Sequence, residues 1–247
     1  MLTVGVDLAA EPAGTALAVV GWGTDGAAIT EVVRGAGDEL LLGAFARAGK
    51  AGIDCPLGWP SAFVSFVADH QAGRVTIPGG LTGRQWRRRL AWRVTDEVVR
   101  AETGLIPLSV AADRIGHTAM RCAGLLAQLA RQGQPVDRCG RGVLVEVYPA
   151  ASLKCWRLPY RGYKDRRNAQ ALEALIDDLL AAAPWLDPGP WESLCRASHD
   201  AADAVIAALT ARAAQKDLVS WPDEREQAAA SSEGWIALPT APLRQLP

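Results

Sequence analysis

The order of the elements predicted for the start of the chain constrains the fold more than any other feature of the sequence. Three short hydrophobic runs at 1–9, 15–22 and 28–33 are separated by glycine-containing turns, and they predict three antiparallel strands. The spacing of apolar residues over 38–48 predicts a helix, and 50–56 predicts a short buried strand that a proline ends. This strand-strand-strand-helix-strand order indicates an α/β domain built on a mixed sheet.

The rest of the sequence predicts mostly helices. A fifth strand is expected at 142–148, and 234–239 is a candidate edge strand. No internal repeat or domain linker is evident, so we expect one domain over 1–247 with a helical insertion at about 60–140, between strands four and five. Helices are predicted at 60–72, 84–102, 111–132, 150–156, 165–183 and 198–214.

The composition limits the classes of protein to which the chain can belong. With 49% hydrophobic and 21% charged residues, the chain is typical of a globular domain with a sizeable core. Its formal net charge of −1 argues against a protein that coats nucleic acid without specificity. No stretch reaches the roughly 18 apolar residues of a membrane helix, and no basic leader precedes the first strand. We therefore expect a cytoplasmic protein with no membrane partner; its oligomeric state is left open.

Metal binding by cysteine is not expected. The cysteines are odd in number, form no CxxC pair and stand at no zinc-ligand spacing from the histidines. The expectation is a reducing compartment and free thiols at Cys55, Cys122, Cys139, Cys155 and Cys195.

Acidic residues stand where the predicted strands end. Asp7, Asp54 and Glu146 close hydrophobic runs, and ligands of open α/β sheets bind at the carboxyl ends of strands. A buried carboxylate is destabilising unless a partner matches its charge, and Mg²⁺ or Mn²⁺ with oxygen ligands supplies that match. Each acid taken singly is equally consistent with a helix cap, a turn or an ion pair. Their recurrence at successive element ends favours a shared metal site.

Two further acids begin a late, alanine-rich helix. Asp200 and Asp203 are three residues apart, so their carboxylates share a helix face and can point at one spot. A capping role explains Asp200 well, whereas Asp203 adds like-charge repulsion that a cation would relieve. His199 stands beside the pair, where it either assists proton transfer or simply starts the helix.

Basic residues interleaved with tryptophan form a candidate substrate surface. The helix predicted at 84–102 carries arginines, Arg88 and Arg93 among them, that suit phosphate contacts beside stacking aromatic rings. The alternative is a solvated helix face balanced by acids such as Asp96. Lys164, in a basic and aromatic loop after the fifth strand, is the favoured phosphate contact, the alternative being an unpaired loop lysine.

Several short motifs resemble the family of unknown function numbered 429, and together they span nearly the whole chain. That family is regarded as predicted nucleases, so the resemblance implies an RNase H-like fold: a mixed five-stranded sheet flanked by helices. The segment 200–204 is also similar to the metal-binding helix of RuvC-type Holliday-junction resolvases, which share the fold. The motifs are 5–9 (GVDLA), 14–18 (GTALA), 53–58 (IDCPLG), 145–149 (VEVYP), 200–204 (DAADA) and 233–236 (EGWI).

The resemblance implies a role for each acid of the site. Asp7 corresponds to the first-strand acid that bridges two metal ions, and Asp54 to the second ligand. Asp203, with Asp200 beside it, corresponds to the acid of the last helix. Glu146 is implied either as a further catalytic ligand or as the residue that orients a lysine or an arginine.

The resemblance also implies a substrate and a reaction. The family's Arg-x-x-Asp element places Arg93 and Asp96 near the cleft, where they would position a phosphate or a water. Nucleic acid is the implied substrate, hydrolysed by a two-metal mechanism with Mg²⁺ or Mn²⁺ ions ~4 Å apart. One ion activates a water and the other stabilises the leaving 3′ oxygen, so no general base residue is required.

Two other classes of protein are left open. A catalytically silent nucleic-acid-binding or scaffold module would keep the fold and some of the acids, and it would bind no metal. An actin-like or sugar-kinase-like phosphotransferase uses a related strand order but needs two such cores and a Gly-Thr pair directly after the first acid. This chain has room for one such core, and Leu8 and Ala9 follow Asp7.

Overall fold

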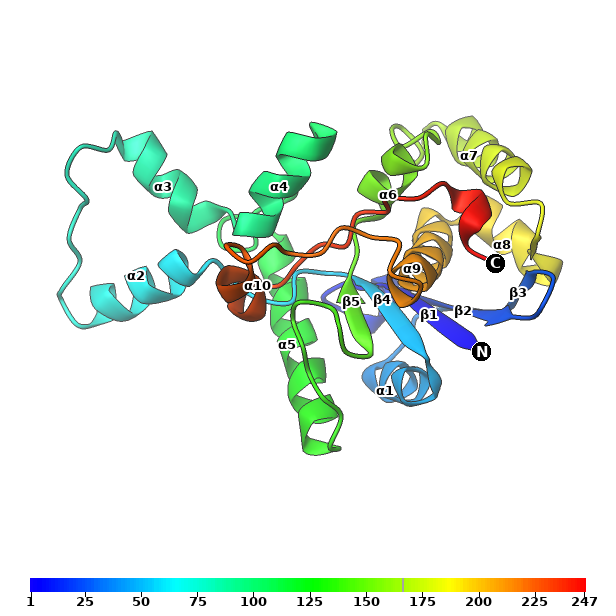
Figure 1. Ribbon diagram of the computed structural model, residues 1–247, viewed down its shortest axis with the longest axis horizontal. Coiled ribbons are helices and arrows are strands. Elements are labelled where there is room, and N and C mark those ends of the chain that lie inside the picture. The colour runs from blue at the N-terminus through cyan, green and yellow to red at the C-terminus, as the bar shows by residue number, and fades with distance from the viewer. Residues whose placement is uncertain (166) are drawn as a thin grey trace.

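A six-stranded mixed sheet forms the centre of the computed structural model, which describes residues 1–165 and 167–247 (Figure 1). The strand order is β5-β4-β1-β2-β3-β6. β1 is antiparallel to β2 and β2 to β3, whereas β4 runs parallel to β1 and β5 parallel to β4. The strands are β1 (Leu2–Asp7), β2 (Ala16–Trp22), β3 (Ala27–Arg34), β4 (Lys50–Asp54), β5 (Leu144–Glu146) and β6 (Leu186–Asp187).

The sheet has one strand more than the five predicted. The antiparallel pairing of the first three strands is confirmed. The additional strand, β6, pairs in parallel with the outer side of β3 and lies between the helices predicted at 165–183 and 198–214. A strand of two residues is too short to show hydrophobic alternation, so no sequence pattern reveals it.

Helices cover both faces of this sheet (Figure 1). α9 packs along β1, β2 and β4 on one face, while α1 and α5 complete the core on the other. The alternation of β1 explains this arrangement, because Val4 and Val6 join Leu41 of α1 and Leu125 of α5, while Gly5 faces α9. The helices are α1 (Asp38–Arg47), α2 (Ser61–Gln71), α3 (Gly83–Ala91), α4 (Val94–Thr103), α5 (Ile115–Arg131), α6 (Pro149–Cys155), α7 (Ala169–Ala182), α8 (Glu192–Ala197), α9 (His199–Gln215) and α10 (Gln227–Glu233).

Between β4 and β5 the described chain consists of helices α2 to α5 and their connections. This is the segment that the sequence predicts as a helical insertion. Within it, α2 and α3 extend away from the sheet (Figure 1). None of the described helices is both long and apolar enough to cross a membrane.

Several predicted boundaries differ from those of the structure. The helix predicted at 84–102 is two helices, because the backbone at Arg93 is extended and the Asp96 carboxylate accepts the Arg93 N–H, which starts α4. The tail at 234–239 makes isolated bridges, such as that of Ile236 with Glu146, in place of an edge strand. Position 166, inside the helix predicted at 165–183, lies outside the described residues.

Candidate functional site

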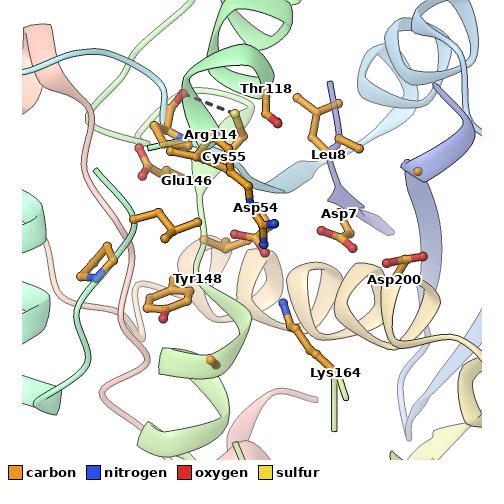
Figure 2. A pocket seen from close by; sticks show the side chains of 18 of the residues that line it. Asp7, Leu8, Asp54, Cys55, Arg114, Thr118, Glu146, Tyr148, Lys164 and Asp200 are labelled. Atoms are coloured by element: carbon orange, nitrogen blue, oxygen red, sulfur yellow. Dashed lines mark hydrogen bonds between the residues drawn. The ribbon is translucent and has the colours of Figure 1, made fainter. Parts of the chain in front are cut away.

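Three aspartates meet at the carboxyl ends of two parallel strands. Asp7 and Asp54 end β1 and β4, and the parallel register places them opposite each other. Asp203 comes from α9, and one carboxylate oxygen from each aspartate lies within 4.8 Å of the other two. The aspartates stand in or beside a cleft of about 790 Å³, into which Asp7, Asp54 and Lys164 point (Figure 2). The structure therefore brings together three of the predicted metal ligands.

Two glycines let α9 approach the sheet closely enough to deliver Asp203. Gly5 and Gly52 pair in register across β1 and β4, two residues before the aspartates, and both face α9. A Cβ atom at Gly5 would lie 1.9 Å from the carbonyl oxygen of Ala204, and one at Gly52 would lie 2.4 Å from that of Ala207. Any other residue at these positions would push the helix, and its aspartate, away from the strand ends.

The positive groups of the protein do not fully neutralise the negative charge of the three aspartates. Burial raises the pKa of Asp7, and the neighbouring carboxylates of Asp203 and Asp54 add to this effect. Together they bring the pKa of Asp7 to about 9. Burial also raises the pKa of Asp54 to about 7, although the ammonium group of Lys164 opposes the shift. Such a cluster takes up positive charge at neutral pH, either as protons or as a bound cation.

Lys164 and Tyr163 hold the buried carboxylate of Asp203. The Lys164 Nζ lies 2.6 Å from Asp203 Oδ2, and the Tyr163 hydroxyl donates to Oδ1 at 2.8 Å. Burial lowers the pKa of Lys164, but the facing carboxylates of Asp203 and Asp54 outweigh it and raise the pKa above its usual value. Lys164, predicted as a phosphate contact, thus faces the acids while 46% of its side chain stays exposed. Tyr163 is not among the predicted site residues, although the aromatic loop that contains it is.

A second group of potential ligands shares Asp7 with the first. Ligand atoms of Asp7, His199 and Asp200 also lie within 4.8 Å of one another. His199 Nδ1 is 2.9 Å from Asp200 Oδ1, and Arg34 approaches Oδ2 of the same aspartate at 3.7 Å. The predicted pair Asp200 and His199 therefore lines the cleft beside the three aspartates.

Glu146 lies beside the cleft but is bound by an arginine. Arg93 donates to both carboxylate oxygens of Glu146, at 2.7 and 2.8 Å. It also donates to Asp96 Oδ1 at 2.9 Å. The N–H of Leu57 donates to Glu146 Oε2 as well. Both oxygens of Glu146 are thus engaged by protein donors, whereas its role as a catalytic ligand stays a prediction. Of the roles implied by the resemblance, orientation of an arginine fits the structure.

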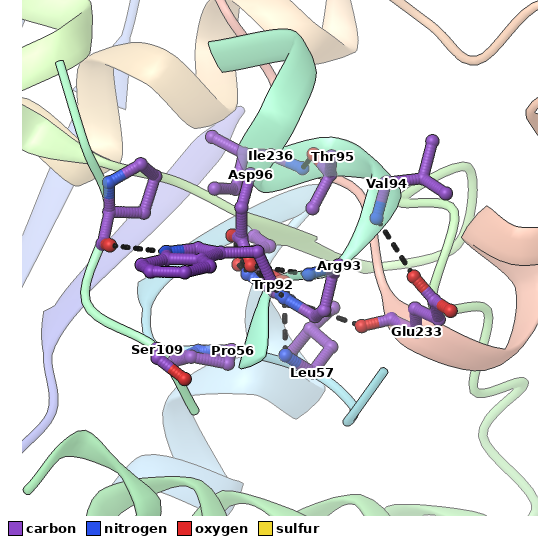
Figure 3. A network of polar contacts seen from close by, with 12 residues as sticks. Pro56, Leu57, Trp92, Arg93, Val94, Thr95, Asp96, Ser109, Glu233 and Ile236 are labelled. Carbon is purple, nitrogen blue, oxygen red and sulfur yellow. Dashed lines mark hydrogen bonds and ion pairs between the residues drawn. The ribbon is translucent and has the colours of Figure 1, made fainter. Parts of the chain in front are cut away.

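The same network engages Arg93 and Asp96, so their contact with a substrate stays a prediction, although Arg93 lines the cleft. Each is 1% exposed, and their charges neutralise one another and Glu146 inside the protein. Arg93 also donates to the Glu233 carbonyl at 3.1 Å, and the Glu233 carboxylate accepts the N–H of Val94 (Figure 3). These residues tie α4 to β5 and to the end of α10. Glu233 begins the family motif at 233–236, but the sequence predicts no role for it.

Arg88 lies outside the acidic cleft, in a neighbouring groove. Its guanidinium pairs with Glu97 and stands over the ring of Trp92, 5.3 Å from the ring centre. Arg89 lines the same groove. The structure therefore places this predicted substrate contact in a groove next to the acidic cleft and not beside the aspartates.

Fold and site together define a mixed α/β protein with an acidic, oxygen-rich cleft at the carboxyl ends of parallel strands. The chain belongs to the family described as "Protein of unknown function (DUF429)", whose model matches residues 5–227. This match confirms the family resemblance seen in the sequence motifs, and it includes Asp7, Asp54 and Asp203. Comparisons with curated proteins and with solved structures gave no significant match.

Proposed function

We propose that this protein is a metal-dependent nuclease that hydrolyses phosphodiester bonds on an RNase H-like scaffold. The observation that carries the proposal is the convergence of Asp7, Asp54 and Asp203, from two strands and a helix, to within 4.8 Å. An acidic cluster so compact, with Asp203 fully buried, has a high electrostatic free energy without a cation. A bound divalent ion would lower that free energy and would give the cluster a role in hydrolysis.

The sheet supports the fold assignment. The order β3-β2-β1-β4-β5, with three antiparallel strands followed by two parallel ones, is the arrangement expected of an RNase H-like core. In this assignment β6 is an addition at the edge beyond β3. The acids then occupy the first strand, the fourth strand and the last long helix of the core.

The residues present fit hard divalent cations. The donors of the main group are all carboxylate oxygens, which Mg²⁺ and Mn²⁺ prefer over nitrogen or sulfur. The two ligand groups share Asp7, so Asp7 would help to hold an ion in either group. Asp54 and Asp203 would complete one position, and Asp200 with His199 the other.

The remaining residues of the cleft have complementary tasks. Bound divalent ions supply an acidified water and electrostatic stabilisation of the phosphate and of the leaving oxygen. Lys164, whose side chain is 46% exposed, would contact a phosphate oxygen of the substrate. His199, at the rim of the cleft, would exchange a proton with the departing group. The cleft of about 790 Å³ has room for a nucleotide with its flanking phosphates.

A panel of labelled single-stranded and duplex DNA and RNA, incubated with Mn²⁺ or Mg²⁺, tests the proposal. Cleavage by the parent protein, its loss on addition of EDTA and its loss in Asp7→Asn are the expected results. Asp178→Asn, which alters an exposed acid on α7, is the matched control and should cleave like the parent. Cleavage that survives in Asp7→Asn would assign the activity to a contaminant or to another site.

The ion pair of Lys164 with Asp203 favours a second candidate, a catalytically silent nucleic-acid-binding module of the same fold. In that case the lysine ammonium permanently takes the place of the cation. Calorimetric titration with Mn²⁺ separates the two candidates. A silent module shows no heat of binding and no thermal stabilisation by Mn²⁺, and its Asp7→Asn variant behaves like the parent.

A further inference from the structure

The segment from Arg74 to Arg93 concentrates positive charge in a chain whose net charge is −1. It contains six arginines and no acidic residue. Segments of this kind bind polyanions, because each arginine that neutralises a phosphate releases a condensed counterion. The acidic cleft by itself repels phosphate, so this charge is the natural place to look for substrate affinity.

The structure places most of this segment on an arm, defined here as residues 61–91, which contain α2, α3 and the loop between them. The arm extends away from the sheet (Figure 1), and neither of its helices contains a buried residue. Phe66 of α2 and Trp86 of α3 pack edge to face, 5.8 Å apart between ring centres. The two helices of the arm therefore pack on each other, and the arm contributes no buried residue to the core.

The arginines of α3 are available to a ligand. Arg84, Arg87 and Arg89 are exposed, and no acid of the described residues forms an ion pair with them. Arg88 is bound to Glu97 and keeps its guanidinium over the ring of Trp92. The described part of α3 thus offers three exposed, unpaired arginines, and Trp92 follows directly after the helix.

A groove of about 500 Å³ lies at the base of the arm, and Arg93 lines both this groove and the acidic cleft. Arg88, Arg89 and Trp92 also line the groove. The indole N–H of Trp92 donates to the Pro107 carbonyl at 3.4 Å (Figure 3), and Pro107 lines the acidic cleft together with the half-exposed Leu108. The groove and the cleft are therefore neighbouring parts of one surface.

We infer that the arm binds single-stranded nucleic acid and leads it along the Trp92 groove into the acidic cleft. Arginines for the phosphates and an aromatic ring for the bases are the combination by which proteins hold single strands without sequence preference. An anionic membrane would also attract the arginines, but it is too flat to enter a groove that Trp92 lines. That the bound nucleic acid leads into the acidic cleft rests on the proposed nuclease function. Its binding to the arm does not depend on hydrolysis.

Fluorescence anisotropy in EDTA tests the inference without cleavage. The probe is a fluorescein-labelled oligo(dT) of about 20 nucleotides, titrated at several salt concentrations with full-length Asp7→Asn protein. Adding Arg84→Gln, Arg87→Gln and Arg89→Gln should weaken binding about tenfold or more and reduce the salt slope by about 2, since each phosphate contact on a single strand contributes about 0.7. The matched control replaces three other exposed arginines: Arg131→Gln, Arg225→Gln and Arg244→Gln.

A second variant separates stacking from charge. Trp92→Leu should weaken oligo(dT) binding about fivefold or more and leave the salt slope unchanged, because it removes a stacking platform and no charge. Thermal melting of each variant checks that the fold is kept, which is expected for α3 because none of its residues is buried.

Three outcomes would overturn the inference. They are an equal loss of affinity in the control triple variant, an unchanged salt slope in the α3 triple variant, and preference for a duplex or for phosphatidylserine vesicles over the single strand. The proposed function is judged separately. If the arm binds the oligonucleotide but the nuclease panel shows no cleavage, the inference about the arm stands and the proposed nuclease function is rejected. If the protein cleaves and the α3 triple variant cleaves equally well, the nuclease function stands and the inference about the arm is rejected.

Discussion

Gly5 lies opposite Gly52 in the parallel pairing of β1 and β4, and both glycines lie under α9. Because each strand continues for two residues to its aspartate, the same pairing places Asp7 beside Asp54. The close approach of helix and sheet then sets where Asp203 stands. The geometry of the acidic site thus depends on Gly5 and Gly52, whose lack of a side chain lets α9 lie close to the sheet.

Gly5→Ala should therefore damage both stability and metal binding. Its Cβ atom would lie 1.9 Å from a backbone oxygen of α9, which cannot move as a side chain can. We expect a loss of about 3 kcal/mol in the free energy of unfolding, the upper end for overpacking, and at least tenfold weaker Mn²⁺ binding. Urea unfolding and calorimetry measure the two effects.

Gly43→Ala is the matched control for this substitution. Gly43 lies within α1, and a Cβ atom there would meet open space. Replacing a helical glycine by alanine should stabilise the protein by about 0.5–1 kcal/mol. If Gly5→Ala unfolds at the same urea concentration as Gly43→Ala, the close-approach explanation is wrong.

The sequence predicts the strand ends and the first two aspartates because the information is local. Hydrophobic runs that stop at Asp7 and Asp54 give both the strand and its end, and the Asp200 and Asp203 spacing gives the shared helix face. A mixed sheet can then be expected to bring these ends together. The two-residue strand β6 lacks any such local pattern and is missed.

The role of Arg93 could not be predicted, because its partner is distant in the sequence. From 84 to 93 the pattern is that of an exposed basic helix, yet Arg93 is fully buried against Glu146, 53 residues away. Nothing near either residue distinguishes a buried pair from two exposed charges. The position of a charged residue in the fold, and not its type, decides whether it contacts substrate or forms a buried ion pair.

Asp54→Asn should separate stability from function at the acidic site. Removing one carboxylate relieves repulsion from Asp203, so the metal-free protein should become more stable at pH 7, with a melting temperature higher by about 2–4 °C for each kcal/mol gained. The same variant should lose Mn²⁺ binding and oligonucleotide hydrolysis. A variant with parental turnover would remove Asp54 from the ligand set.

The stability of the metal-free protein should fall as the pH rises. Asp7 ionises near 3.8 in the unfolded chain and at about 9 in the folded protein, so between these values the folded state holds the extra proton. Raising the pH through this window therefore favours unfolding, and the full stabilisation is present only below about pH 4. Urea unfolding in EDTA at pH 5, 7 and 9 measures the slope, which Asp7→Asn should flatten. A slope that is the same in the variant would point to other groups.

Breaking the buried network should destabilise the protein without removing the metal site. Arg93→Met leaves Glu146 and Asp96 buried and unpaired, and we expect a loss of about 3–5 kcal/mol. Glu146→Gln keeps the shape and leaves Arg93 paired with Asp96, so its loss should be smaller. Because Glu146 is held by Arg93 and lies outside both ligand groups, Mn²⁺ affinity should stay within about threefold of the parent in Glu146→Gln. Calorimetry of this variant decides the point, since a hundredfold loss of affinity would return Glu146 to the metal ligands.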